Sequence, residues 1–244
     1  MQNHLHFNSL GSTNLHLKHL AAAADKPLSS FFTITADRQE SGRGRQQRTW
    51  ESEDGKNLLM SVLLYPPYPP QKQFYVCRYV SLALVQFLTK QLHIENVYIK
   101  YPNDIYIGNQ KVAGILIEHF LQGDTINYSI AGIGLNVNQA VFPANIPNPT
   151  SIFLETNKEF PPLFCMEKIV ENIKELSVYE FVALEEQYEQ FLYKKNEYAF
   201  YLMPQQSASP LEAKIKGVTE NGLLHLSDKS EQSFFCALNE IVYL

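Results

Sequence analysis

Four short β segments follow one another between residues 97 and 137, with only tight turns between them. They span residues 97–100, 105–107, 112–120 and 126–137. β-Branched and aromatic residues fill these segments, and Gly108-Asn109 and Gly123-Asp124 are turn signals between them. Consecutive hairpins pair neighbouring strands in antiparallel fashion. This stretch therefore commits the chain to an antiparallel sheet.

The segments on either side supply the rest of the fold. Residues 30–36 and 57–65 have the composition of strands, and apolar residues recur at helical spacing over 73–93 and 162–195. Lys194 and Lys195 are expected at the end of the second helical stretch. From residue 198 onwards every pattern is typical of strands. We predict an α+β fold: a mixed, largely antiparallel sheet with flanking helices over residues 1–195, and a small C-terminal β-barrel domain over 196–244.

Composition restricts the class of protein. With 244 residues, 45% of them hydrophobic, the chain can bury a core without disulfides. Cys77, Cys165 and Cys236 lie far apart, which favours free thiols in a reducing compartment. The first ten residues lack the apolar stretch of a signal peptide, and no apolar run reaches the roughly 20 residues of a membrane helix. We expect a soluble, cytoplasmic protein that binds no membrane.

The segment with the most unusual chemistry spans residues 37–50, where four arginines are interleaved with two glycines. Glycine lets backbone N–H groups approach an anion, and guanidinium groups bind phosphate or carboxylate with two parallel hydrogen bonds. The alternative is a solvated turn whose arginines pair with Asp37, Glu40 and Glu51. The segment is not a phosphate-binding Walker loop, because no Gly-Lys-Ser/Thr follows it.

Two further polar segments are candidates for a site. Lys111 begins an apolar β segment shortly after the turn Pro102-Asn103-Asp104, so its amine either reaches solvent at the sheet edge or points into a pocket. Ser12-Thr13-Asn14 precedes a helical pattern and acts either as a helix cap or as a set of donors for a ligand. None of the seven histidines belongs to a known metal-binding motif.

Taken together, the polar segments resemble the biotin–protein ligases. The matching motifs are Ser12-Thr13-Asn14, Gln39 with Gly42-Arg43-Gly44-Arg45, Lys100-Tyr101-Pro102-Asn103-Asp104, Lys111-Val112-Ala113-Gly114-Ile115-Leu116-Ile117-Glu118 and Gly132-Ile133-Gly134-Leu135-Asn136-Val137-Asn138. One such motif is weak, but several in the same order and spacing are highly specific. The resemblance covers the first domain almost entirely, and the small C-terminal domain also fits it.

The resemblance implies that the first domain has the fold of the biotin/lipoate ligase catalytic domain, which is similar to that of class II synthetases. It also implies a reaction in two steps. Biotin is first activated by ATP, with Mg²⁺, as biotinyl-5'-AMP, and is then transferred to one lysine of a biotin carboxyl carrier domain of acetyl-CoA carboxylase or a related carboxylase. The chemistry requires cations fixed around the reacting oxygens. The resemblance leaves the direct metal ligands open.

Roles for individual residues follow from the same motifs. The implied catalytic residues are Lys111, Arg43, Arg45 and Asp104. The implied biotin-binding residues are Ser12, Thr13, Asn14, Gln39, Arg43, Gly44, Arg45 and Lys111. The implied nucleotide-binding residues are Arg45, Arg48, Trp50, Asn103, Lys111 and Asn136. Asp104 is expected to accept or orient the proton of the carrier lysine, and the loop from Gln39 to Trp50 is expected to close over the adenylate and exclude water.

Three positions depart from the family pattern. Tyr101 stands where tryptophan is usual, and Gln47 replaces a glycine. Glu51 follows Trp50, so this position supplies no second aromatic contact to the adenine. Because the motifs begin at Ser12, we expect the short form of the family, without an N-terminal DNA-binding domain and without DNA as a partner. An exposed edge of the sheet is expected to pair two subunits as a homodimer.

Two other functions remain open at this point. A lipoate– or octanoate–protein ligase or transferase has a similar fold and a pocket lysine, but it carries a motif with several adjacent glycines that is absent here. A nucleic-acid-binding module would use the Arg-Gly segment, but it requires aromatic residues among the basic ones, and only Trp50 is near. A net charge of -5 also argues against this second alternative.

Overall fold

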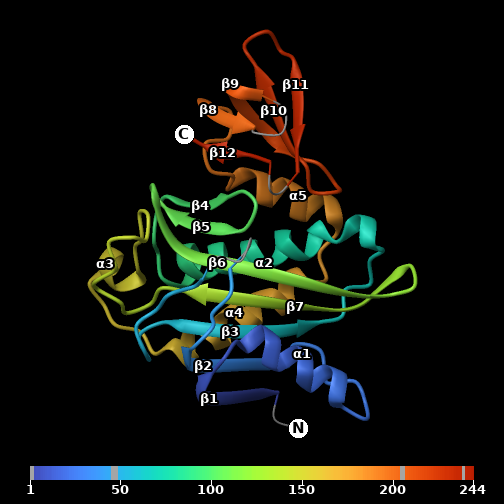
Figure 1. The fold of residues 1–244 in the computed structure, drawn as a ribbon, viewed down its shortest axis with the longest axis vertical. Helices are drawn as coiled ribbons and strands as arrows, with labels where there is room; N and C mark the ends of the chain where they lie inside the picture. The colour runs from blue at the N-terminus through green and yellow to red at the C-terminus, as the bar shows by residue number, and fades with distance from the viewer. Residues whose placement is uncertain (1–2, 45–48, 204–206, 238–239) are drawn as a thin grey trace.

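A computed structural model describes residues 3–44, 49–203, 207–237 and 240–244. Within these ranges seven strands form a large sheet in the order β1-β2-β3-β7-β6-β5-β4 (Figure 1). Their bounds are β1 His4–Leu10, β2 Thr33–Gln39, β3 Leu58–Leu64, β4 Val97–Lys100, β5 Asp104–Ile107, β6 Gln110–Gln122 and β7 Thr125–Leu135. The pair β1–β2 is parallel and the other neighbouring pairs are antiparallel. The predicted mixed, largely antiparallel sheet is confirmed.

The hairpins predicted over residues 97–137 are strands β4 to β7. Gly108 and Gly123 lie in the turns between them with φ of 55° and 58°, a left-handed conformation that glycine adopts without steric cost. The turn at Gly123 joins β6 to β7, and the pairing of these two strands, with one register shift between Phe120 and Leu121, places Gly114 opposite Gly134 and Leu116 opposite Gly132. This pairing therefore brings three glycines onto one face of the sheet.

The two faces of the large sheet are covered differently. Helices α2 (Phe74–Gln86) and α4 (Pro162–Leu176) share the main core with one face, and a π-helical turn (Phe87–Gln91) extends α2. On the other face, α1 (Thr13–Ala23) packs through Leu17 onto Ile34, Leu63 and Ile130. The described elements also include the short helices η2 (Pro70–Lys72) and α3 (Ile152–Thr156). Over the described part of the chain, no helix has both the length and the apolar character to span a membrane.

The structure divides the helical stretch predicted over residues 162–195. Helix α4 ends at Leu176, and α5 spans Phe181–Gln190. The expected end at Lys194 and Lys195 is wrong, since both residues follow α5 rather than closing it. Residues 177–180 contain no glycine or proline to signal a break between two helices. The helical spacing of apolar residues also continues across them. The chain turns there because α5 packs against α2, beneath the C-terminal sheet (Figure 1).

The C-terminal strands form a second, smaller antiparallel sheet in the order β11-β10-β9-β8-β12. Their bounds are β8 Tyr198–Met203, β9 Ser207–Val218, β10 Leu224–Asp228, β11 Ser233–Cys236 and β12 Val242–Tyr243. No pairing between β11 and β12 closes this sheet into a barrel among the residues described. Tyr201, Ile215 and Leu226 are buried in the same core as the large sheet. The division at residues 195 and 196 stays a prediction.

Half-buried His119 on β6 is expected to make the stability of the fold pH-dependent. Burial lowers its pKa from 6.5 to about 4, and its Nδ1 lies 2.8 Å from Ser129 Oγ. Because the unfolded state binds the proton first, the free energy of unfolding is expected to fall as pH drops from 6.5 towards 4, by about 2 kcal/mol at pH 5. Urea denaturation at pH 7.5 and pH 5 measures this difference.

The variant His119→Gln isolates the contribution of this side chain. It is expected to reduce the stability difference between the two pH values by about 2 kcal/mol. The matched control is His19→Gln on the exposed surface of α1, which is expected to retain the wild-type difference. Equal pH dependence in the wild type and in both variants would contradict the assignment to His119.

Candidate active site

Three glycines form a floor that carries no side chains of its own, on the face of the sheet that α1 covers only in part. Gly114 on β6 lies opposite Gly134 on β7, and Gly132 lies two residues before Gly134 on the same face. A Cβ atom at Gly132 would overlap the Asn14 side chain, and one at Gly134 would overlap the Trp50 indole. A Cβ atom at Gly114 would lie 2.9 Å from a carbon of the same indole. The glycines therefore admit two side chains from other segments directly onto the sheet.

The segment Ser12-Thr13-Asn14 begins α1 at one end of this floor. Ser12 caps the helix, with its hydroxyl 3.5 Å from the Leu15 amide nitrogen, so the first of the two alternatives for this segment, a helix cap, is present. Thr13 donates hydrogen bonds from its backbone N–H (2.7 Å) and its hydroxyl (3.0 Å) to Gln39 Oε1. Because Gln39 accepts both bonds through Oε1, the two hydrogens on its Nε2 remain available to donate to another group.

Two residues that received no role from the sequence complete this polar cluster. The Ser61 hydroxyl on β3 is fully buried and lies 2.7 Å from Thr13 Oγ1 and 2.6 Å from Asn14 Oδ1. Asn14 Nδ2 donates to Glu118 Oε2 at 2.8 Å. Ser61 carries the one hydroxyl in the apolar strand Leu58–Leu64. This polar residue in an apolar segment was the sequence signal that could have identified it as part of the site. Glu118 lies within a motif quoted above, at its last position.

Lys111 lies at the other end of the floor and points inward. Its Nζ is 2.8 Å from Asp104 Oδ1 and 5.6 Å from the centroid of the Trp50 ring. Its side chain is 29% exposed, and its backbone is held on both sides, because its N–H donates to Asn148 O and its carbonyl accepts from Thr150 N–H. The alternative of a lysine reaching away to solvent at the sheet edge is therefore wrong.

The described part of the Arg-Gly segment ends against this lysine. The Trp50 amide donates to Gly42 O at 3.0 Å, and Arg43 forms a backbone bridge with Thr49, so the two ends of the loop lie side by side. The Trp50 indole Nε1 is buried, and none of the described residues forms a hydrogen bond with it. The Arg43 side chain is exposed. Residues 45–48 lie outside the described residues, and with them Arg45, Arg48 and Gln47.

The two asparagines expected near the nucleotide use their side-chain amides to hold backbone. Asn103 Nδ2 donates to Ile115 O at 2.6 Å, and Asn136 Nδ2 donates to Thr150 O at 2.9 Å. Each bond fixes a loop beside Lys111, the turn at residues 102–104 in one case and the segment at 148–150 in the other. Each side chain keeps its Oδ1 and one Nδ2 hydrogen for a ligand.

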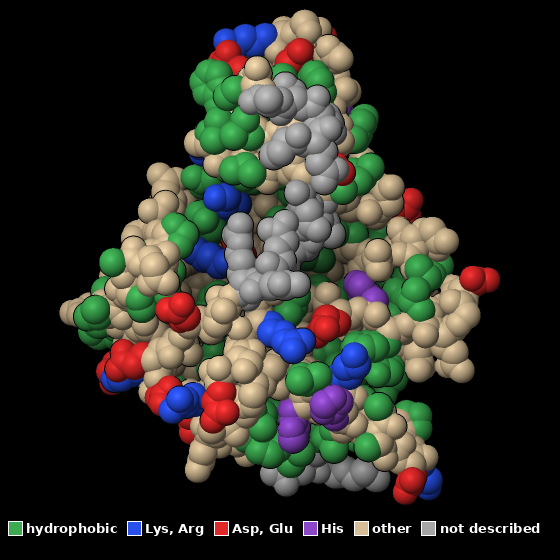
Figure 2. All heavy atoms as spheres, in the orientation of Figure 1, with side chains coloured by type: hydrophobic (Ala, Val, Ile, Leu, Met, Phe, Trp, Pro, Cys, Tyr) green, Lys and Arg blue, Asp and Glu red, His purple; other side chains and the backbone are tan. Residues whose placement is uncertain are grey.

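The assembled site combines hydrogen-bond donors, a cation and an aromatic surface around one floor. Figure 2 shows Lys and Arg side chains gathered around the middle of this face of the molecule. Within the described ranges, no group of three or more His, Cys, Asp or Glu residues is arranged to hold a metal ion. Such an arrangement suits an anionic ligand with an apolar part, because the cation neutralises charge while the glycines allow close approach.

Comparisons with known proteins agree on one family. Residues 12–136 match the model of the biotin/lipoate A/B protein ligase family. The bifunctional ligase/repressor BirA of Bacillus subtilis is 36% identical over 139 residues, which cover 57% of this chain and 42% of the relative. Biotin--[acetyl-CoA-carboxylase] ligase of Mycobacterium tuberculosis is 30% identical over 146 residues, which cover 58% and 52%. This chain therefore spans about half or less of these curated relatives.

A solved structure matches the chain over nearly its whole length. The biotin protein ligase from Aquifex aeolicus, in complex with biotin and ATP, superposes with a TM-score of 0.79 at 25% sequence identity. The match covers 99% of this chain and 98% of the other, so it includes both sheets.

Proposed function

The chain belongs to the biotin/lipoate A/B protein ligase family, and from this premise we propose that it is an ATP-dependent biotin–protein ligase. The family predicted from the sequence motifs is confirmed. The activity proposed for the chain is formation of biotinyl-5'-AMP followed by transfer of the biotinyl group to a carrier lysine. One observation carries the proposal: Lys111 Nζ lies beside both Asp104 and Trp50, over a floor of glycines that leads to the Thr13–Gln39 pair.

In the first step, the biotin carboxylate attacks the α-phosphorus of ATP, and pyrophosphate leaves. Two anions must approach each other, so a fixed cation between them lowers the barrier. Lys111 supplies that cation in the proposal, because its ammonium already lies inside the site with a carboxylate as its partner. Arg43 and Arg45 are proposed to add charge from the loop. Mg²⁺ would reduce the negative charge of the triphosphate when bound.

The described residues fit a magnesium ion that arrives on the nucleotide. Mg²⁺ in such sites is held by one or two carboxylates together with substrate phosphates. Asp104 is the carboxylate beside Lys111, and its side chain is 26% exposed. Asp104 would therefore be the carboxylate available to hold the ion together with the substrate phosphates, since the residues that the structure describes form no dedicated metal cage.

In the second step, the amine of the carrier lysine attacks the acyl carbon, AMP leaves, and the amine loses a proton. A lysine amine has an ordinary pKa of about 10.4, so the step needs a proton acceptor close to the site. Asp104 is proposed as that acceptor. The partner is proposed to be a biotin carboxyl carrier domain of acetyl-CoA carboxylase or a related carboxylase, in the cytoplasm. A homodimer formed through a sheet edge stays a prediction.

Asp104→Asn is expected to slow the transfer step more than the adenylation step. Asp104→Asn keeps an oxygen that accepts a hydrogen bond from Lys111 but cannot take a proton. We expect transfer from preformed biotinyl-5'-AMP to the carrier to slow by about tenfold or more, while pyrophosphate exchange changes less. The two rates are measured separately, by single turnover and by isotope exchange. An equal loss in both rates would contradict a proton-accepting role.

Trp50 is proposed to support the adenine ring. Removal of a stacking side chain costs about 1–3 kcal/mol per base, so Trp50→Ala is expected to raise KM for ATP by about tenfold or more. Trp50→Phe keeps an aromatic surface and serves as the matched control, with a smaller expected rise. Steady-state exchange at varied ATP concentration gives both values. An unchanged KM for ATP in Trp50→Ala would place the nucleotide elsewhere.

The direct test of the proposed function compares acids as substrates for ATP–pyrophosphate exchange. Biotin is expected to support exchange, and lipoate and octanoate are not. The lipoate and octanoate ligases are the second candidate because they belong to the same family. Exchange driven by lipoate or octanoate, and not by biotin, would overturn the proposal in favour of that candidate.

A further inference from the structure

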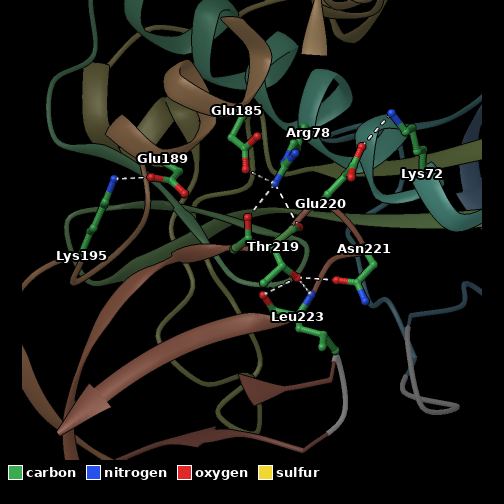
Figure 3. Close-up of polar contacts among 10 residues, drawn as sticks. Lys72, Arg78, Glu185, Glu189, Lys195, Thr219, Glu220, Asn221 and Leu223 are labelled. Atoms are coloured by element: carbon green, nitrogen blue, oxygen red, sulfur yellow. Dashed lines mark hydrogen bonds and ion pairs between the residues drawn. The ribbon is translucent and has the colours of Figure 1, made fainter. Parts of the chain in front are cut away.

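The turn between β9 and β10, residues 219–223, docks the C-terminal sheet onto the catalytic part of the chain. We call it the docking turn. Arg78 on α2 is fully buried and donates from Nη2 to Val218 O (2.7 Å) and Thr219 O (3.1 Å), while pairing with Glu185 on α5 at 3.2 Å (Figure 3). Lys72 forms an ion pair with Glu220 at 2.7 Å. The turn is therefore fixed to the helix layer, because a buried arginine that loses its acceptors is costly.

Tyr101 holds the same turn from the side of the active site. Its side chain is 2% exposed, and its hydroxyl donates to Gly222 O at 2.7 Å, with Cys236 O at 3.4 Å. Gly222 has φ +87°, and a Cβ atom there would lie 2.8 Å from the Phe74 ring. The carbonyl that accepts the bond thus belongs to a position where any residue with a side chain would be strained and would displace Phe74.

The neighbouring Lys100 makes a second contact with the C-terminal sheet. Its ammonium lies 4.8 Å from the centroid of the Tyr243 ring on β12 and 4.7 Å from that of Tyr106. It also donates to the Tyr106 hydroxyl at 3.2 Å. Burial lowers the pKa of this lysine. Two consecutive residues are therefore tied to the smaller sheet.

These two residues lead directly into the turn that carries Asp104. Lys100 is the cross-strand partner of Asp104 on β4 and β5, and Tyr101 begins the turn at residues 101–103. Asp104 in turn holds Lys111 at 2.8 Å. A shift of Tyr101 would displace the Asp104 carboxylate, and displacements of about 1 Å are enough to slow a reaction strongly.

We propose that Tyr101 is a positioning residue, whose hydroxyl bond to Gly222 uses the C-terminal sheet to hold Asp104 in place for biotinyl transfer. The inference rests on the proposed function for its kinetic part. Tyr101 stands where the family pattern has tryptophan, and its hydroxyl is the group that donates to the docking turn. Tyr101 acts through Asp104 and contacts no substrate itself.

The test compares two tyrosine-to-phenylalanine variants. Tyr101→Phe removes the bond to Gly222 and keeps the ring. Tyr201→Phe is the matched control, since the buried Tyr201 hydroxyl in the C-terminal sheet has no hydrogen-bond partner among the described residues. We expect kcat for transfer to the carrier to fall about tenfold in Tyr101→Phe, with KM for biotin within about twofold of wild type, and neither to change in the control. Equal kinetics in the two variants would overturn the proposal.

A second measurement does not depend on activity. Hydrogen exchange of the backbone amides at residues 103–107 is expected to be about tenfold faster in Tyr101→Phe than in wild type, and unchanged in Tyr201→Phe. The same exchange rate at 103–107 in all three proteins would overturn the coupling between the sheets. A wild type without ligase activity, together with faster exchange in Tyr101→Phe, would overturn the proposed function and leave the coupling supported.

Discussion

Replacement of Lys111 by alanine is expected to reduce biotin-dependent ATP–pyrophosphate exchange by about 10²- to 10³-fold. The ammonium is the one cation that the described residues place inside the site, between Asp104 at 2.8 Å and the Trp50 ring at 5.6 Å. Without it, the biotin carboxylate would meet the α-phosphate beside an unpaired Asp104 carboxylate. Both effects act on the same step, so the loss is expected mainly in kcat.

The control for this variant is Lys26→Ala, which removes an exposed lysine in the loop after α1. Its exchange rate is expected to equal that of wild type. Lys111→Arg keeps the charge but changes the shape of the group, and we expect it to recover only part of the rate. Normal exchange by folded Lys111→Ala would exclude Lys111 from the chemistry.

The second large effect, on KM for biotin, is expected from Gly132→Ala, which adds one methyl group to the floor of the site. A Cβ atom at Gly132 would overlap Asn14 Oδ1, so Gly132→Ala must displace the Asn14 side chain from its bonds to Ser61 and Glu118. We expect KM for biotin to rise about 100-fold, equivalent to about 2.7 kcal/mol. The expected change in kcat is smaller, because Lys111 and Asp104 lie at the other end of the floor.

Gly11→Ala is the matched control, because a Cβ atom there would meet no atom within 4 Å. It introduces the same methyl group one residue before Ser12 and is expected to keep KM for biotin within about twofold of wild type. Titration of biotin in the exchange assay measures both variants. A normal KM in Gly132→Ala would contradict the role of Asn14 in biotin binding.

Local signals explain why much of the fold was predictable. The hairpins over residues 97–137 depend on turns at Gly108 and Gly123, whose requirements are written in two or three residues each. The break between α4 and α5 has no such signal. It depends on packing of α5 against α2, and the apolar spacing continues through residues 177–180. Register set by turns can thus be predicted, whereas a helix boundary set by tertiary packing cannot.

The candidate site shows the same limit. Motif resemblance selected Thr13, Gln39, Asp104 and Lys111, and the structure brings them around one floor. Ser61 carried only the weak signal of a hydroxyl in an apolar strand. The bond from Tyr101 to Gly222 joins residues 121 positions apart, so no pattern local to either residue predicts it. The roles of Arg45 and Arg48 stay predictions.

Transfer of biotin to a carrier tests the central claim most directly. Wild-type protein is incubated with biotin, MgATP and a biotin carboxyl carrier domain, and the intact mass of the carrier is then measured. The account predicts that the carrier gains the mass of one biotinyl group, that omission of ATP prevents the gain, and that Lys111→Ala reduces it strongly. An unmodified carrier after incubation with folded wild-type protein, or equal modification by Lys111→Ala, would contradict the account.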